Sequence, residues 1–507
     1  MTVDAYSGER TLRNAWQFLI GKGFTAICTV FLVGFVVRFL ALSEYAFYIS
    51  VVAALETGLV LSSLGIDWVI IRYVPQFVVG GTYSGLKTFI KSMVVYRVIS
   101  MVVFAGVAAI VTYYLAPILF FGRTIALLLL TALFISEGLL RLLRDNTLES
   151  LANQSLTQFG VILRQGLFLA LLAGMAATGS SSTVEVVLIS ELTASLMALS
   201  FAIYAVLKTI SPLRSRGRLT EWSPPGLLAM RRTAWHNYLS GLLSYPFSAQ
   251  ALVLLIVTIN GPSGAALFGF VTRIVEILRG YLPALLLMNV LRPRLFGIYE
   301  KTKQFEKPAS EARLISGLSF FAIFPVIVIT ALYGDWFIGV ASGGRFQEGN
   351  HLLLLLVMSL VFRVQRQMAT LLINCVKLSS ILIQNAIYSL LLIPVLLALM
   401  GIQDIPLFAA VAILWDDVLW TLCSAYFLKS AGFKWSADLA LMAKLTCVSL
   451  LCFFSLSFIP MLPSLIAVLI SSILVTIIFG FYLFVFQPLG ADLVKVRQMV
   501  FTSLGKK

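Results

Sequence analysis

Long apolar stretches follow one another along almost the whole chain, with short polar interruptions between them. A helix needs about 20 mostly apolar residues to cross the hydrocarbon core of a bilayer. Such stretches lie near residues 15–40, 44–66, 92–116, 124–143, 157–178, 184–207, 236–260, 265–290, 314–333, 351–374, 381–401, 405–428, 439–459 and 463–486. The pattern predicts an all-α polytopic membrane protein with about 14 transmembrane helices.

Composition supports a chain that is solvated by lipid. Of its 507 residues, 60% are hydrophobic and 12% are charged, with a mean hydropathy of +0.98. A soluble domain has about twice this charged fraction. A net charge of +15 would suggest a nucleic-acid partner in a soluble protein, but here the position of the charges matters more than their sum. We expect no nucleic-acid partner.

Lysine and arginine outside the predicted helices concentrate in alternate connections. The two ends and the connections after even-numbered helices hold nearly all of them, including Arg141, Arg144 and Arg164, which this interpretation assigns to inner segments. The connections after odd-numbered helices hold only Arg123 and Arg345. Basic residues favour the cytoplasmic side of a membrane. The sequence therefore predicts a multi-pass protein with both termini in the cytoplasm.

A weak internal repeat divides the chain. The segment Arg13-Asn-Ala-Trp16 opens the first helix, and the similar segment Arg232-Thr-Ala-Trp235 precedes the seventh. One residue later in register, Glu56 of the second helix matches Glu276 of the eighth. Parallel repeats of this kind are common in transporters. We expect an N-terminal lobe (1–207), a basic cytoplasmic linker (208–235), a C-terminal lobe of six helices (236–428), and two extra helices with an amphipathic cytoplasmic tail (429–507).

Ionisable side chains within the predicted helices are the main candidates for function, because charge in a bilayer is costly. The bases are Lys22, Arg38, Arg97, Arg273, Arg279, Arg363 and Arg366, and the acids are Glu56, Glu137, Glu191, Glu276, Asp416 and Asp417. Near-balance between the two signs indicates that many of them pair. Glu137 and Glu191 have no obvious partner in the sequence.

Two interpretations remain open for the arginines of the eighth and tenth helices. Arg273 and Arg279 flank Glu276 at helical spacing, so the three form a salt-bridge ladder or line an anion-binding cavity. The second pair, Arg363 and Arg366, either binds two aspartates, Asp416 and Asp417, or lines the same cavity. The planar fork of arginine suits a diphosphate.

The first two helices add three further candidates. Lys22 and Arg38 either reach out to lipid headgroups or face the cavity. Coupling to an ion gradient requires a carboxylate that binds a proton or another cation. Glu56 and Glu276 are the first candidates, and Asp416 and Asp417 are the others.

The sequence indicates a transporter rather than an enzyme. No phosphate-binding loop of the P-loop type is present. The predicted outer connections are short, and the longest, about from Gly334 to Asn350, is too small for a soluble active site. The five cysteines fall in apolar segments and show no metal-ligand spacing. We expect no metal and no cofactor.

With these features assembled, the chain resembles the Wzx-type polysaccharide flippases of the multidrug/oligosaccharidyl-lipid/polysaccharide exporter superfamily. The likeness is carried by the run from Leu12 to Gly23 in the first helix, by the run from Leu42 to Tyr48 opening the second, and by a segment of the first inner connection. In that segment a Gly-led turn at Gly65 is followed by Arg72-Tyr-Val-Pro75.

This resemblance implies two six-helix lobes around a central cationic cavity, alternating access, and a polyprenyl-diphosphate-linked oligosaccharide as substrate. It also implies a place in the bacterial inner membrane, with lipids and polysaccharide polymerase and export machinery as partners. In related peptidoglycan-precursor flippases, basic residues of the first and eighth helices bind substrate; the matching positions here are Lys22, Arg38, Arg273 and Arg279. The seventh helix offers no charge, so Arg363 and Arg366 are expected to substitute.

Two other functions remain open at this point. A cation-coupled multidrug antiporter has the same fold, although its cavity is expected to carry net acidic charge. A membrane-embedded polysaccharide polymerase or ligase belongs to the same kind of pathway, but such enzymes usually need a large outer loop.

Overall fold

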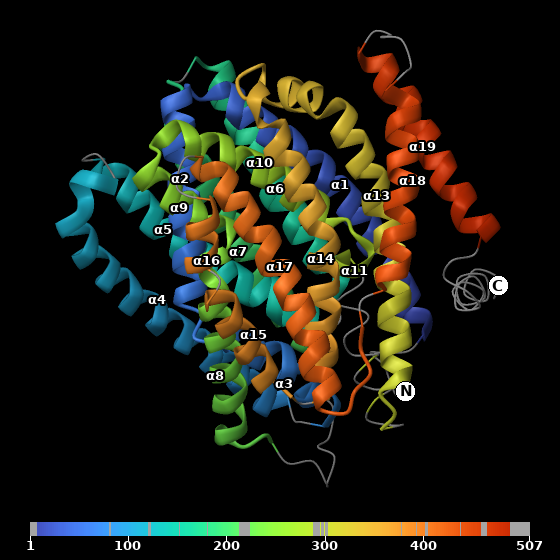
Figure 1. Cartoon of the computed structure of the whole chain (residues 1–507). Helices are drawn as coiled ribbons and strands as arrows, with labels where there is room; N and C mark the ends of the chain where they lie inside the picture. Colours follow the sequence, from blue (N-terminus) through green and yellow to red (C-terminus); the bar gives the residue numbers. More distant parts are fainter. Residues whose placement is uncertain are drawn as a thin grey trace. The chain divides into compact units, whose positions relative to one another are not determined.

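The computed structural model describes residues 8–80, 83–119, 123–151, 153–179, 181–211, 224–286, 295, 299, 303–376, 378–391, 393–400, 404–436, 438–457 and 464–486. All regular secondary structure in these residues is helical, as the sequence predicted. Contacts divide the chain into two units (Figure 1). Unit 1 comprises Met1–Leu242 and Val253–Ala266, and unit 2 comprises Leu243–Leu252 and Leu267–Lys507.

Unit 1 contains the elements of the first half of the chain. They are α1 (Gly8–Phe39), α2 (Leu42–Leu61), α3 (Ile66–Gly80), α4 (Tyr83–Leu119), α5 (Thr124–Arg141), the π-helix η1 (Leu142–Leu148), α6 (Gln154–Ala177), α7 (Val184–Ile210) and α8 (Leu227–Ser244). Most of α9 (Ala249–Ile259) also falls in this unit.

Unit 2 contains the later elements. They are the short helix η3 (Tyr245–Phe247), most of α10 (Pro262–Gly280), α11 (Pro283–Leu286), α13 (Glu306–Ser342), η4 (Gln347–Gly349), α14 (Asn350–Cys375), α15 (Ser380–Leu391), α16 (Ile393–Met400), α17 (Ile405–Ser430), α18 (Leu439–Ser457) and α19 (Ser464–Phe486). The two last helices pack against α13 (Figure 1).

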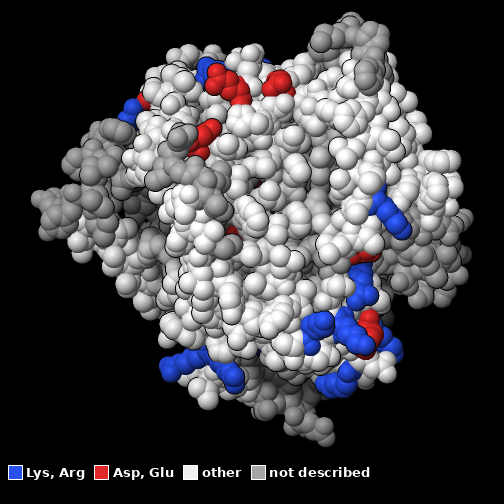
Figure 2. All heavy atoms as spheres, in the orientation of Figure 1, with Lys and Arg blue, Asp and Glu red and all other residues white. Residues whose placement is uncertain are grey.

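The number of spans agrees with the hydropathy pattern. Within the described residues, 12 helices are long and apolar enough to cross a membrane, or up to 13 when α8, η3 and α9 count as one bent span. The remaining predicted span coincides with α10, which carries Arg273, Glu276 and Arg279. On the face seen in Figure 2, broad areas of the described surface carry no charged side chain. The protein is a multi-pass membrane protein.

Three elements differ from the predicted boundaries. The seventh span bends by 40° where η3 separates α8 from α9, and Pro246 lies in this break. The ninth span is the 37-residue helix α13, so much of the outer connection expected from Gly334 to Asn350 is helical. The eighth span ends sooner than the predicted residue 290, because α10 ends at Gly280. Residues 212–223 of the predicted linker and the tail after Phe486 lie outside the described residues.

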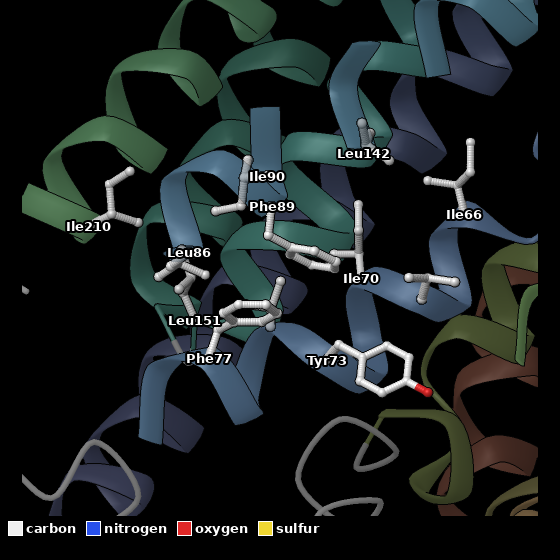
Figure 3. Close-up of a cluster of buried hydrophobic side chains, with 12 residues drawn as sticks. Ile66, Ile70, Tyr73, Phe77, Leu86, Phe89, Ile90, Leu142, Leu151 and Ile210 are labelled. Carbon is white, nitrogen blue, oxygen red and sulfur yellow. The ribbon is translucent and has the colours of Figure 1, made fainter. Parts of the chain in front are cut away.

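The inner connection after α2 is itself structured, as the amphipathic helix α3. Its buried face holds Ile70, Tyr73 and Phe77, which join side chains of α4, η1 and α7 in one hydrophobic cluster (Figure 3). The ring of Phe77 stacks on that of Phe89 with centroids 4.8 Å apart. The cluster fixes α3 against the helices of unit 1.

The first half of α8 is held against the turn between α2 and α3. The hydroxyl of Tyr238 donates to the carbonyl of Leu61 at 2.9 Å. Gly65 has φ of 75°, and a Cβ atom there would lie 2.2 Å from the carbonyl oxygen of Ala234. Only glycine combines this backbone conformation with such a close approach.

Candidate functional site

Six charged side chains from three helices meet inside unit 2. They are Glu276 and Arg279 of α10, Arg363 and Arg366 of α14, and Asp416 and Asp417 of α17. We call them the unit 2 charge cluster. Helices α14 and α17 pack along each other, which brings the two arginines to the two aspartates.

Each arginine of α14 is held by more than one carboxylate. The guanidinium of Arg363 donates from Nε to Asp417 at 2.9 Å and from Nη1 to Glu276 at 3.3 Å. Arg366 donates from Nη1 to Asp417 at 3.0 Å and also to Asp416. Its guanidinium lies 4.5 Å from the centre of the Trp420 ring. The pairing interpretation of the sequence therefore applies to both arginines.

Side-chain exposure increases across the unit 2 charge cluster, from the aspartates of α17 to Glu276 and Arg279 of α10. Asp416 and Asp417 are 4% and 1% exposed. The side chains of Glu276 and Arg279 are 34% and 35% exposed, and Arg279 donates to Glu276 at 2.8 Å. The predicted ladder on this helix is thus only partly formed, because Arg273 is exposed and pairs with no acid among the described residues.

Two polar side chains of α15 face α17. The hydroxyl of Ser389 is within hydrogen-bond reach of the Asp416 carboxylate. The amide of Asn385 donates to Ser424 at 2.8 Å, and its buried oxygen has no hydrogen-bond partner among the described residues. Ser389 and Asn385 lie one turn apart on α15, which packs against α17. An uncompensated buried oxygen such as that of Asn385 is costly. Carboxylate, hydroxyl and amide oxygens suit a proton or a small cation.

Unit 1 contains a second network of charges. Arg141 of α5 donates from both Nη atoms to Glu56 of α2, at 2.5 and 2.7 Å. Arg164 of α6 donates to Glu137 at 2.5 Å and to Glu191 of α7 at 2.9 Å. Arg141 is also 3.8 Å from Glu137. We call these five residues the unit 1 charge cluster.

The sequence interpretation counted Arg141, Arg144 and Arg164 with the inner segments, but all three lie within candidate spans. The π-helix η1 continues α5, so the span runs over Thr124–Leu148 and includes Arg141. Arg164 lies inside the span Gln154–Ala177. These two arginines are the partners that the sequence did not reveal for Glu137 and Glu191. The spacing of Glu137 and Arg141, four residues apart, was the one local signal for this network.

The two clusters repeat one arrangement. In each unit a glutamate of the second helix, Glu56 or Glu276, accepts from an arginine of the fourth, Arg141 or Arg363. A second arginine follows three residues later in both helices, at Arg144 and Arg366. The repeat inferred from a few sequence matches is therefore visible in side-chain pairing.

The remaining predicted site residues lie elsewhere. Lys22 and Arg38 belong to α1 in unit 1, where Lys22 is half-buried and Arg38 is exposed. Neither is part of the unit 1 charge cluster. Among the described residues, no group of three or more His, Cys, Asp or Glu side chains is arranged to hold a metal ion.

A further ionisable group of unit 1 lies at the start of α3, outside the spanning helices. Asp67 accepts a hydrogen bond from the side-chain amide of Asn146, in η1, at 2.7 Å. Burial raises the pKa of Asp67 above its ordinary value, and the nearby charges of Arg97 and Arg141 only partly oppose this rise. Arg97 itself is 3% exposed and donates to the carbonyl of Leu59 at 3.1 Å, at the end of α2.

No protein-family model matches the chain, and no curated protein matches its sequence. Solved structures do resemble it. Lipid II flippase MurJ in an inward closed conformation aligns with a TM-score of 0.60 at 13% identity, over 92% of this chain and 98% of that chain. An outward-facing multidrug resistance MATE family transporter of the MOP superfamily aligns with a TM-score of 0.58 at 13% identity, over 84% of this chain and 96% of that one.

An inward-facing transporter of the same MATE family aligns with a TM-score of 0.54 at 14% identity, over 79% of this chain and 97% of the other. At such low identities the likeness concerns the fold alone. The chain has the fold of these transporters, two of which belong to the MOP superfamily.

Proposed function

We propose that the protein is a flippase that moves a polyprenyl-diphosphate-linked oligosaccharide repeat unit from the cytoplasmic to the periplasmic leaflet. The membrane is the bacterial inner membrane, and the product serves cell-surface polysaccharide or exopolysaccharide biosynthesis. Polysaccharide polymerase and export machinery would use the translocated unit. No bond is made or broken; the protein alternates between states open to the inner and the outer leaflet.

The observation that carries this proposal is the chemistry of the more exposed end of the unit 2 charge cluster. Arg279 and Arg363 present guanidinium groups that are 35% and 19% exposed, within a segment of otherwise apolar helices. Donors of this kind bind a diphosphate in a bidentate manner and keep their charge when partly desolvated. The alignment with a lipid II flippase over 92% of the chain supports a lipid-linked substrate.

Roles for the other predicted residues follow from the same proposal. Arg273, Arg366, Lys22 and Arg38 complete the set of bases that attract the diphosphate. Glu56, Glu276, Asp416 and Asp417 are the candidates for ion coupling. Asp416 is the best placed of the four, because it is buried within hydrogen-bond reach of the hydroxyl of Ser389, and the two oxygens together suit a proton or a small cation.

A deletion strain tests the function. We expect lipid-linked repeat units to accumulate unpolymerised, with loss of surface or secreted polysaccharide. Purified protein in liposomes should move a fluorescent lipid-linked oligosaccharide between leaflets. Formation or cleavage of glycosidic bonds by the purified protein would contradict the proposal.

Arg279→Lys tests the substrate contact. Lysine keeps the charge and much of the volume but loses the bidentate fork. We expect normal protein level and poor export. Normal export from alanine variants at both Arg273 and Arg279, at unchanged protein level, would show that α10 does not bind the substrate.

A cation-coupled multidrug antiporter is the second candidate. The observation in its favour is that multidrug transporters align with a TM-score of 0.58, close to the value for the flippase. Efflux of cationic dyes from cells that express the protein separates the two functions. Dye efflux together with normal polysaccharide in the deletion strain would favour the antiporter.

A further inference from the structure

The two repeated glutamate–arginine pairs have a common geometry that goes beyond simple neutralisation. In unit 1, Arg141 has its Nε atom 3.8 Å from Glu137, and in unit 2, Arg363 donates from Nε to Asp417 at 2.9 Å. Both acids are almost fully buried, at 2% and 1% side-chain exposure. A buried acid therefore lies on the Nε side of each arginine, as a hydrogen-bond partner in unit 2 and as a longer charge–charge contact in unit 1, where Glu137 is hydrogen-bonded to Arg164.

The Nη edges of the same arginines point to partners that are partly exposed at the protein surface. Glu56 accepts from both Nη atoms of Arg141, and Glu276 accepts from Nη1 of Arg363. These glutamates are 20% and 34% exposed. An exposed ion pair contributes little because water solvates both partners once they separate, whereas a buried acid that loses its partner is strongly penalised. Of the two acids near each arginine, the glutamate is therefore the one that can dissociate at the lower cost in free energy.

We propose that each unit contains an anion site on the Nη edge of this arginine, which its glutamate occupies while no substrate is bound. The ligand is a diphosphate group, whose oxygens replace the carboxylate on the guanidinium fork. The inference rests on the proposed function for the identity of the natural ligand. It adds Arg141 to the substrate-binding residues and makes Glu56 and Glu276 competitors of the substrate.

The two sites are not equal in strength. Glu276 also accepts from Arg279, at 2.8 and 3.1 Å. Departure of Glu276 therefore exposes two adjacent guanidinium groups, those of Arg279 and Arg363, which together can bind both phosphates of a diphosphate. We expect the unit 2 site to bind a diphosphate more tightly than the unit 1 site.

Inorganic diphosphate is the probe, and its binding to the purified full-length protein in nanodiscs is the readout. Glu56→Gln and Glu276→Gln remove the competing charge and leave an isosteric amide. Each should raise the affinity for diphosphate by about tenfold, which corresponds to about 1.4 kcal/mol, and Glu276→Gln should have the larger effect. Adding Arg141→Gln to Glu56→Gln should abolish the gain from Glu56→Gln.

The chain supplies a matched control at another ion pair of unit 1. Arg123 donates to Glu44 at 2.5 and 2.9 Å, with side-chain exposures of 36% and 16% that are close to the 37% and 20% of Arg141 and Glu56. Arg123 precedes α5 and lies outside the span Thr124–Leu148 that contains Arg141, so Glu44→Gln removes a similar ion pair without freeing an arginine inside a span. This variant should leave diphosphate affinity unchanged.

Unchanged or weaker binding in both Glu56→Gln and Glu276→Gln, in protein that remains monodisperse, would overturn the proposal. An equal gain in Glu44→Gln would also overturn it, because the effect would then be one of general charge. Should a glutamine variant fail to fold, Glu56→Asp and Glu276→Asp retract the carboxylate and should give a smaller gain. Binding does not require transport, so failure of the flippase assay with intact diphosphate binding would reject the proposed function and leave the anion sites.

Discussion

Asp417 joins both arginines of the unit 2 charge cluster. Its Oδ2 atom accepts from Arg363 and its Oδ1 atom from Arg366, and the residue is 1% exposed. In Asp417→Asn both arginines lose a compensating charge at a buried position, and one amide nitrogen faces a donor. Removing one partner of a buried pair costs about 3–5 kcal/mol. We expect a lower unfolding temperature of the purified protein and a reduced protein level.

Asp404→Asn is the control for this experiment. Asp404 is the exposed N-cap of the same helix, α17, and accepts from the backbone amide of Leu407 at 3.1 Å. Asparagine is an equally good N-cap, so the unfolding temperature should not change. An equal loss in both variants would show that the pairing of Asp417 contributes nothing specific.

Asp67 gives a prediction about pH. Burial raises its pKa above the ordinary 3.8, so the folded state holds the proton more tightly than the unfolded state. Stability from this group is then fully present below pH 3.8 and is lost as pH rises through the folded pKa. Asp67→Asn keeps an oxygen for Asn146 and cannot ionise. Its unfolding temperature relative to the unmodified protein should rise between about pH 4 and pH 7.

The same scan with Asp404→Asn controls for general effects of pH. A difference between Asp67→Asn and the unmodified protein that stays constant or falls across this range would contradict the raised pKa. The measurement needs only the purified protein and thermal unfolding, and it is independent of the substrate.

At the residue level, the sequence was informative where both partners lay within predicted helices. Arg363, Arg366, Asp416 and Asp417 were placed in two helices at similar depth, and their pairing was one of two stated alternatives. The unit 1 charge cluster could not be assembled in the same way. Arg141 lies near the end of its apolar stretch, and hydropathy alone does not show that a π-helix carries the span further.

The turn between α2 and α3 shows how one residue determines the position of an element. Gly65 has φ of 75°, and its missing side chain leaves room for the backbone of Ala234 in α8. Gly65→Ala adds backbone strain and a contact of 2.2 Å to a carbonyl oxygen that cannot give way easily. We expect α8 to move off the turn, with a lower unfolding temperature and greater protease sensitivity near Tyr238.

Gly23→Ala provides the comparison. Gly23 lies within α1, and a Cβ atom there meets nothing within 4 Å. Alanine favours a helix by up to about 1 kcal/mol over glycine, so this variant should be unchanged or slightly more stable. Similar stability for both variants would mean that the close approach at Gly65 is unimportant.

At the level of elements, spans follow from hydropathy because lipid demands a continuous apolar helix. Interruptions inside spans are harder to predict. The bend at Pro246 depends on packing within the protein, which restores hydrogen bonds that the helix loses. The outward extension of α13 beyond Tyr333 was missed because Gly334 and Asp335 resemble the start of a loop.

For the whole molecule, the strongest untested prediction is the orientation of the helices. Reporter fusions after Gly179, Gly261 and Gly343 should lie outside. Fusions after Arg218, Lys303 and Lys434 should lie in the cytoplasm. Correction of Arg141 and Arg164 to positions within spans does not change which connections are basic. A single reversed reporter among the six would show that a span is missing or superfluous.

The internal repeat is the feature of the whole chain that sequence and structure describe together. A few sequence matches around Glu56 and Glu276 indicated the repeat. In the structure each of these glutamates pairs with an arginine of the fourth span of its unit, Arg141 or Arg363. The substrate could not be read from the fold, because flippases and multidrug transporters of this superfamily share it. That distinction depends on side chains at a few positions and not on the course of the backbone.

The dense pairing of charges within the spans also limits how this sequence can change over evolutionary time. A lone replacement of Glu137, which is 2% exposed and bound by Arg164, leaves this buried arginine with Glu191 alone as its hydrogen-bonded counter-charge. Substitutions at positions 137 and 164 should therefore arise together in homologues, as should those at 363 and 417. Positions 44 and 123, whose pair is open to solvent, should drift more independently. Covariation in a deep alignment would reveal this difference.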